Sequence, residues 1–168
     1  GQNRLLRFFN FNRLEETRVA EVIALAAEEL SHNQVGAIIA IEREMGLGEY
    51  VETGTPLQAR VSAPLLNTIF SPYSPLHDGA AIIRGDTIVA AGAILPLTQF
   101  PVADKSLGTR HRAALGLSEE TDAVVVVVGD IDPAQTLAWV EEYFGDIGPS
   151  PLPEWPDISE PRQEEEKR

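Results

Sequence analysis

Residues 36–42 read GAIIAIE, a short apolar run rich in isoleucine, and predict a buried β-strand. Two more apolar runs, at 80–83 and 87–95, predict a pair of strands joined by a turn at 84–86. The run at 123–128 predicts a further strand. Because helical patterns separate these runs, we expect an α/β fold, a single domain with a central mixed β-sheet flanked by helices.

Apolar residues at helical spacing predict the helices. The first helix is expected to follow Asn12, a candidate N-cap with Glu15 three residues later. Its apolar positions are Val19, Val22, Ile23, Ala26 and Leu30. Ser62 is a typical N-cap for a second helix, and a third is expected at 109–117. The segment 49–53 is expected to form a strand.

Composition divides the chain into three parts. Residues 1–12 are basic and aromatic and are interpreted as a lead-in segment. Residues 13–147 are predicted to form the domain, whose last element would be a helix starting at Asp132-Pro133. Prolines and charges dominate residues 148–168, which are predicted to be a disordered tail. Because the chain begins without Met, we expect it to be a fragment of a longer protein.

The composition argues against several classes of function. With 43% hydrophobic and 23% charged residues, the 168-residue chain has the make-up of a globular protein. The absence of cysteine excludes disulfides, thiolate zinc sites and cysteine nucleophiles. The formal net charge of −13 argues against a broad surface for nucleic acid, but one arginine cluster can still hold a phosphate. No run has the length and apolarity of a membrane span, and no signal peptide is recognised.

Two short motifs carry the chemistry. Residues 76–80 read LHDGA and place an acid and an imidazole at a tight turn, and residues 108–112 read GTRHR at the start of a predicted helix. Taken alone, an Asp-Gly pair is typical of a turn, and a short basic cluster is typical of a solvated surface. Together they combine an acid that can hold a metal with a helix start that can hold phosphate. This combination favours phosphoryl-transfer chemistry on a nucleotide.

On these motifs the chain resembles the diadenylate cyclase domain, which makes cyclic di-AMP from two ATP, and it is most similar to the membrane-anchored bacterial type. The resemblance runs from about Val19 to Val128. The matching stretches are 36–42 (GAIIAIE), 74–80 (SPLHDGA), 95–97 (LPL), 107–114 (LGTRHRAA) and 116–123 (GLSEETDA). The paired Asp-Gly-Ala and Arg-His-Arg motifs are highly specific for this family.

The resemblance implies a role for each candidate residue. Asp78 would hold a divalent metal (Mn²⁺, Mg²⁺ or Co²⁺) and help prepare the ribose 3′-hydroxyl for attack on an α-phosphate, with His77 as a neighbouring ligand. Gly79 and Ala80 would line the ribose, and Leu95 would meet the adenine. The triphosphate would be bound by Gly108, Thr109, Arg110, His111 and Arg112. The catalytic set implied in this way is Asp78, Arg110, His111 and Arg112.

The resemblance also implies partners and a location. Two domains would face each other as a homodimer, because each 3′-hydroxyl must reach the α-phosphate of the other ATP. The catalytic domain would be cytoplasmic, and the full-length protein would be anchored to the membrane through a region outside this chain. A regulatory protein partner is compatible with this arrangement.

The sequence departs from the family after Val128. The family usually shows Ser-Glu-Glu there, in which the serine meets phosphate and the second glutamate meets metal. This chain reads Gly129-Asp130-Ile131-Asp132, so Gly129 replaces the serine and Ile131 stands at the metal-glutamate position. Asp130 and Asp132 are the candidate replacements for the glutamate. Two alternatives to an active cyclase therefore stay open. One is a catalytically impaired nucleotide-binding regulatory domain, and the other is a scaffold domain that binds protein partners.

Overall fold

A five-stranded sheet lies at the centre of the computed structural model, which describes residues 2–99 and 108–129, with side chains from residue 17 onward. The described elements all belong to one unit, Gly1–Ile131. The strands are β1 (Ala37–Ile41), β2 (Thr55–Arg60), β3 (Ala80–Arg84), β4 (Thr87–Ala93) and β5 (Val124–Val128). Their order is β2-β4-β3-β1-β5. Only β1 and β3 pair in parallel among them, so the sheet is mixed, as predicted.

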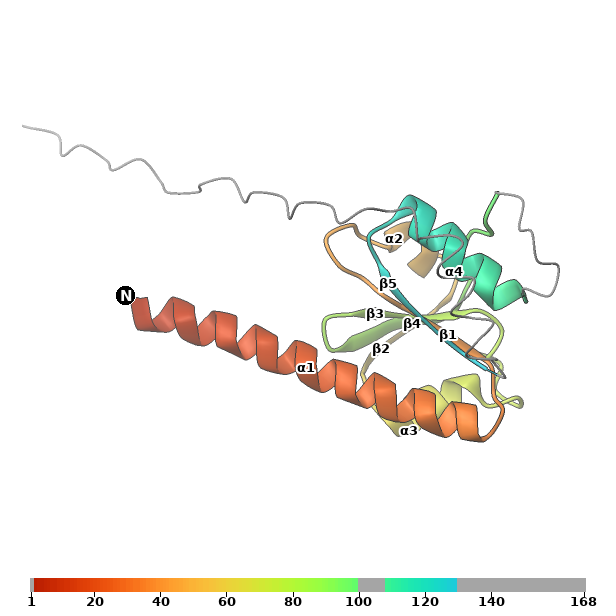
Figure 1. Ribbon diagram of the computed structural model, residues 1–168, viewed down its shortest axis with the longest axis horizontal. Coiled ribbons are helices and arrows are strands. Elements are labelled where there is room, and N and C mark those ends of the chain that lie inside the picture. The colour runs from red at the N-terminus through yellow and green to blue at the C-terminus, as the bar shows by residue number, and fades with distance from the viewer. Residues whose placement is uncertain (1, 100–107, 130–168) are drawn as a thin grey trace, which may run out of the picture. The chain divides into compact units, whose positions relative to one another are not determined.

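Helices cover both faces of this sheet. The helices are α1 (Gln2–His32), α2 (Gly48–Val51), α3 (Ala63–Phe70) and α4 (Thr109–Glu120). Figure 1 shows α1 and α3 on one face and α2 and α4 on the other. Because side chains alternate along a strand, Ile39 of β1 packs in the core of the α1 and α3 face and Ile38 packs in the core under α4. Burial on both faces explains why the 36–42 run is apolar throughout.

The strand predicted at 49–53 is wrong. These residues enter the short helix α2, because the N–H groups of Tyr50 and Val51 donate to the carbonyl of the fully buried Leu47 at 3.1 and 3.0 Å. The strand instead follows as β2, which contains Pro56. Proline is tolerated there because β2 is an edge strand, where one row of backbone groups has no partner strand.

The predicted helix start at Asn12 is also wrong, since α1 begins at Gln2. No proline or glycine occurs in the sequence from residue 2 to residue 32, so nothing interrupts the helical backbone there. The predicted N-cap Ser62 is confirmed, because its hydroxyl accepts a hydrogen bond from the N–H of Leu65 at 3.4 Å. The helix predicted at Asp132 and the predicted tail lie outside the described residues.

The predicted hairpin of β3 and β4 is confirmed and carries an irregularity at its far end. Arg84 pairs with Thr87 across a tight turn in which Gly85 adopts a φ of +60°. Further along, Ala80 pairs with Ala93 but Ile82 pairs with Ala90, so β4 contains an extra residue there. This β-bulge lies at the end of β4 where the candidate site is found.

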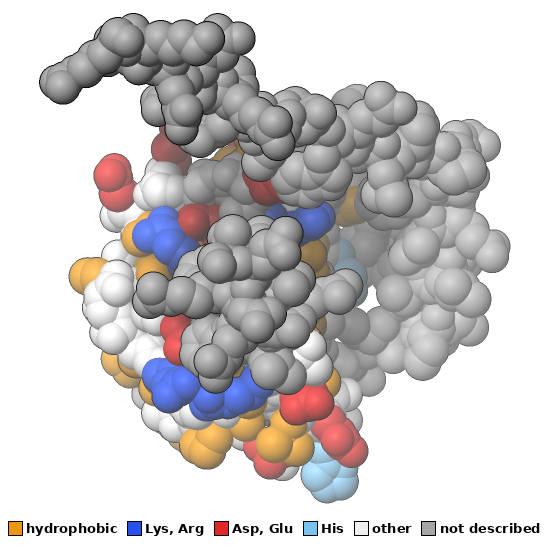
Figure 2. Space-filling view, turned by 90° about the vertical axis from the view of Figure 1, so that its left-hand side faces the viewer, with side chains coloured by type: hydrophobic (Ala, Val, Ile, Leu, Met, Phe, Trp, Pro, Cys, Tyr) orange, Lys and Arg blue, Asp and Glu red, His pale blue; other side chains and the backbone are white. Residues whose placement is uncertain are grey.

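Charge is distributed in groups over the surface. In the described part of the face shown in Figure 2, basic side chains lie in separate groups beside acidic ones. One described pair joins Arg84 to Glu42, whose Oε1 lies 2.5 Å from Nε of the arginine. This guanidinium lowers the pKa of the Glu42 carboxyl. The Glu42 carboxylate also accepts the N–H of Leu47 at 2.8 Å, so it ties the end of β1 to the start of α2.

Candidate active site

A cavity of about 570 Å³ opens at one end of the central strands. At this end of the sheet β1 and β3 begin, β4 ends and α4 starts. The lining residues are Ile38, Asp78, Gly79, Ala80, Gly92, Ala93, Ile94, Leu95, Leu97, Thr109, Arg110 and Ala113. Cavities of roughly 300–1,000 Å³ are typical of small-molecule and cofactor sites. The volume is therefore sufficient for a nucleotide.

The structure brings the two sequence motifs together in this cavity. The candidate residues that line it are Asp78, Gly79, Ala80, Leu95, Thr109 and Arg110. The remaining candidates with described side chains neighbour these residues in sequence but do not line the cavity, and they are His77, Gly108, His111 and Arg112. Asp130 lies outside the described residues. An acid and a helix start that are far apart in the sequence thus face one volume.

A pair of glycines brings the acidic turn close to the sheet. Gly79 follows Asp78 with a φ of +125°, and a Cβ there would lie 2.6 Å from the carbonyl carbon of Gly92. Gly92 has a φ of +66° and is, with Ala91, one of the two β4 residues at the bulge. Because neither residue carries a Cβ, the two backbones can approach closely. This contact places the exposed side chain of Asp78 at the mouth of the cavity.

The tautomer of His77 follows from its contact with Ser74. The Nδ1 atom of His77 lies 2.6 Å from the carbonyl oxygen of Ser74. Because a carbonyl only accepts hydrogen bonds, Nδ1 carries a proton, and in the neutral tautomer of the ring the lone pair is therefore on Nε2. The chain thus offers a carboxylate and an imidazole nitrogen in consecutive residues. Both are metal-ligand types, although no group of three such residues occurs in the described part of the chain.

The start of α4 forms the opposite wall. Gly108 is its N-cap and, because glycine has no side chain, it offers no side-chain hydrogen bond to the first N–H groups of the helix. Free N–H groups and the positive end of the helix dipole favour anions at such a position. Thr109 and Arg110 line the cavity beside this helix start, whereas Arg112 is exposed and does not line it. The wall has the chemistry of a phosphate site.

His111 differs from its two arginine neighbours because it is partly buried. Burial lowers the pKa of its imidazole below the ordinary value. The side chain is therefore mainly neutral at neutral pH. Any contact that it makes with a phosphate then uses one ring N–H as donor rather than a full positive charge.

Residues 94–98 form an apolar segment that makes the third wall of the cavity and is hydrogen-bonded to α4. The N–H of Thr98 donates to the carbonyl of Arg112 at 3.0 Å, and the Thr98 hydroxyl donates to Glu119. A Cβ at Gly116 of α4 would lie 2.8 Å from the carbonyl carbon of Leu97, so helix and segment are in close contact. The segment presents Ile94, which is 70% exposed, to the cavity. Exposed apolar side chains of this kind suit the flat face of an aromatic base.

Several lining residues were missed by the sequence interpretation. They are Ile38, Gly92, Ala93, Ile94, Leu97 and Ala113. Leu97 belongs to the Leu-Pro-Leu stretch that contributed to the family resemblance, which was a usable signal. Gly92 interrupts the apolar run 87–95 and could have indicated a bulge. The exposure of Ile94 has no signature in the sequence, because exposure depends on which residues pack against it.

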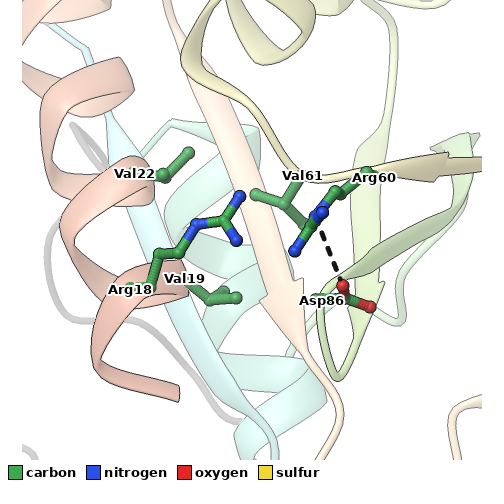
Figure 3. Close-up of a pocket in the computed structure, with 6 residues that line it drawn as sticks. All are labelled: Arg18, Val19, Val22, Arg60, Val61 and Asp86. Atoms are coloured by element: carbon green, nitrogen blue, oxygen red, sulfur yellow. Dashed lines mark ion pairs between the residues drawn. The ribbon is translucent and has the colours of Figure 1, made fainter. Parts of the chain in front are cut away.

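A second hollow contains two arginines but is too small for a nucleotide. It lies between α1 and the end of β2, and Figure 3 shows Arg18 and Arg60 pointing toward it. Nε of Arg60 lies 3.5 Å from the carboxylate of Asp86, so part of this positive charge is already paired. The volume of about 10 Å³ leaves room for roughly one water molecule. The larger cavity is therefore the candidate site.

Comparisons with known proteins show the family to which the chain belongs. A family model described as DisA bacterial checkpoint controller nucleotide-binding matches residues 24–136. The diadenylate cyclase of Listeria monocytogenes serotype 1/2a is 42% identical over 138 residues, which cover 82% of this chain and 50% of that protein. The chain thus spans about half the length of this curated relative.

Solved structures show the same fold. The crystal structure of a double mutant of DacA from Staphylococcus aureus matches with a TM-score of 0.66 and 37% identity, covering 77% of this chain and 97% of that one. The crystal structure of a hypothetical membrane spanning protein from Bacillus cereus matches with a TM-score of 0.63 and 48% identity, covering 66% of this chain and 54% of that one. In the present structure, none of the described helices has the length and apolarity to cross a bilayer.

The end of the chain is also similar to a second family. A model described as Peptidase M16 inactive domain matches residues 118–168 and overlaps the first match up to residue 136. The departure from Ser-Glu-Glu at 129–132 falls inside this second match. The first match covers more than half of the chain and confirms the resemblance to the diadenylate cyclase domain. The chain therefore belongs to the DisA bacterial checkpoint controller nucleotide-binding family.

Proposed function

We propose that this chain is the catalytic domain of a diadenylate cyclase, which condenses two ATP into cyclic di-AMP and releases two pyrophosphates. The observation that carries the proposal is the single cavity that Asp78 and the start of α4 share. An acid for a metal and a cationic helix start for phosphate are the two halves of a phosphoryl-transfer site. The diadenylate cyclase of Listeria monocytogenes, at 42% identity, supports the same activity.

Each wall of the cavity has a task in this mechanism. Arg110, Thr109 and the N–H groups in the first turn of α4 hold the triphosphate and orient it for in-line attack. The apolar segment around Leu95 receives the adenine, and Gly79 and Ala80 leave room for the ribose. Pyrophosphate then leaves from the arginine side. The protein contributes mainly positioning and charge, because phosphoryl transfer needs little covalent help.

Asp78 and His77 are the residues that would hold a divalent metal, Mn²⁺, Mg²⁺ or Co²⁺. Two protein ligands suit such an ion, because Mg²⁺ is usually bound by one or two carboxylates together with substrate phosphates. The exposed carboxylate of Asp78 fits this requirement, and Nε2 of the neutral His77 tautomer would add a nitrogen donor of the kind that transition metals bind. When bound, the metal would neutralise phosphate charge and lower the pKa of the 3′-hydroxyl.

Two copies of the chain are needed for the reaction. One cavity takes one ATP, and each 3′-hydroxyl must reach the α-phosphate of the other nucleotide. A face-to-face homodimer with two-fold symmetry satisfies this requirement. The exposure of Asp78 supports the arrangement, because a second ATP-loaded domain can approach this side. We further propose a cytoplasmic domain that is anchored through a region outside this chain, since one similar structure is named a membrane spanning protein.

The proposal is tested by incubating the purified protein with ATP and Mn²⁺, Mg²⁺ or Co²⁺ and measuring cyclic di-AMP. Asp78→Asn should abolish the product while most ATP affinity and the fold are kept, because it removes a charge but conserves size. Activity per subunit should fall on dilution. Near-normal turnover of the Asp78→Asn protein would contradict the role of Asp78, and constant activity of a proven monomer would contradict the dimer.

A second candidate function is a nucleotide-binding domain without turnover. The observation that favours it is the departure at 129–132, where the sequence has Ile131 in place of an acid and is similar to a second family. Such a domain would bind ATP in the same cavity but form no cyclic di-AMP with any of the three metals. Binding and product measured on one sample distinguish the two functions.

A further inference from the structure

The start of β1 lies directly beneath the guanidinium group of Arg110. A Cβ at Gly36 would lie 2.6 Å from Nη1, 3.0 Å from Cζ and 3.4 Å from Nε of Arg110. All three atoms belong to the planar end of that side chain, so the guanidinium lies over the Cα of the glycine. Gly36 itself does not line the cavity, whereas Arg110 does.

Glycine occupies this place both before β1 and after the adjacent strand β5, so neither residue places a side chain there. Ala37 pairs with Val128 in the antiparallel ladder of β1 and β5, which places Gly36 opposite Gly129. A Cβ at Gly129 would lie 3.9 Å from the Cα of Gly36 and would not meet Arg110 within 4 Å. At this position the guanidinium therefore packs on the backbone of Gly36.

The charge of Arg110 is available for a ligand. The ion pairs seen among residues 17–99 and 108–129 join Arg60 to Asp86 and Arg84 to Glu42, and neither uses Arg110. The side chain is half-buried at the wall of the cavity. Its direction is thus set by packing against β1 rather than by a carboxylate.

We propose that Gly36 is a positioning residue for ATP: its missing side chain fixes where the Arg110 guanidinium meets the triphosphate. This inference rests on the proposed function, since it assigns Arg110 to phosphate. Any side chain at position 36 occupies the space of the guanidinium and pushes it away from its place in the wall. A shift of about 1 Å at such a contact is enough to weaken a charged hydrogen bond.

Gly36 differs in this respect from other tightly packed glycines of the chain. A Cβ at Gly54, Gly79 or Gly116 would meet backbone atoms, so substitution there strains the fold. At Gly36 the obstructing atoms are the end of a flexible side chain, which can move at little cost. Gly36→Ala therefore keeps the fold and moves only the arginine. Gly46, where a Cβ would meet nothing within 4 Å, provides a matched control.

The test measures the dissociation constants of ATP and adenosine for the full chain and its variants. Gly36→Ala should raise the dissociation constant of ATP about tenfold or more and leave that of adenosine unchanged. The unfolding midpoint should stay close to that of the parent protein. Gly46→Ala should change none of the three. In an Arg110→Ala background, Gly36→Ala should cost no further ATP affinity, because the group that it displaces is gone.

The NMR signal of the Arg110 Nε–H group, identified by its loss in Arg110→Ala, gives a readout without nucleotide. It should shift in Gly36→Ala and stay in place in Gly46→Ala. An unmoved signal, an equal loss of ATP and adenosine affinity, or a full effect of Gly36→Ala in the Arg110→Ala background would each overturn the proposal. Failure of the parent protein to bind ATP would refute the proposed function and with it the role of Gly36 toward ATP.

Discussion

Replacing Gly79 by alanine tests how the acidic turn is held against the sheet. The φ of +125° at this residue lies outside even the left-handed region that other residues sometimes adopt, and such backbone strain costs about 1–3 kcal/mol. The new Cβ would also lie 2.6 Å from the carbonyl carbon of Gly92 and 2.7 Å from the carbonyl oxygen of Ala93. Overpacking of this kind costs a further 1–3 kcal/mol or so. We expect Gly79→Ala to lower the free energy of unfolding by about 2–6 kcal/mol in total.

Gly85→Ala is the matched control for this experiment. Gly85 also has a positive φ, of +60°, but a Cβ there would meet nothing within 4 Å. Its replacement therefore adds only the backbone cost of about 1–2 kcal/mol. The difference between the two variants in urea unfolding, compared at equal m-values, gives the cost of the contact with β4 together with the additional backbone strain at a φ of +125°. If the two variants lose the same stability to within about 0.5 kcal/mol, the close approach of the acidic turn to β4 is not what requires glycine.

Three further predictions concern the charges of the site. Arg110→Ala should weaken the binding of ATP by about 1.5–3 kcal/mol and hardly change the binding of adenosine. Arg112→Ala should weaken ATP binding less, because Arg112 is exposed and does not line the cavity. Calorimetric titration measures both affinities, and an equal loss for ATP and adenosine would indicate a folding defect instead. Because burial lowers the pKa of His111 in the folded protein, the unfolded chain binds a proton at this imidazole more tightly than the folded protein does. The free energy of unfolding should therefore decline as the pH falls below about 6.5. His111→Gln should reduce that decline in urea midpoints between pH 7.5 and 5.5, and an unchanged profile would contradict it. Ile131→Glu should lower the metal concentration for half-maximal cyclase rate, since an apolar side chain cannot ligate a hard cation; no change, together with loss of activity in Asp130→Ala, would make Asp130 the ligand.

Local signals in the sequence were sufficient for much of the fold. The isoleucine run at 36–42, the Ser62 cap and the hairpin around Gly85 all appear where they were predicted, because each depends on residues close together in the chain. The two failures have different causes. At Asn12 a local N-cap pattern was present, but no proline or glycine separates it from the helix that begins at Gln2. At 49–53 a local strand pattern was present, but the buried residue before it favours a helical turn. Helix α1 continues through the first position, and the buried side chain of Leu47 accompanies a helical turn at the second.

The candidate site divides in the same way. The sequence alone determined which residues carry the chemistry, because Asp78 and the Gly108–Arg112 stretch each form a recognisable motif within a few residues. Only the tertiary structure decided that they face one cavity, since this depends on the strand order that sets the start of β3 beside β1 and on α4 lying across that end of the sheet. The contact of Gly36 with Arg110 joins residues more than 70 positions apart, and no local pattern encodes it. A motif depends on residues that are neighbours in the sequence, whereas the distance between two motifs depends on long-range strand pairing and helix packing.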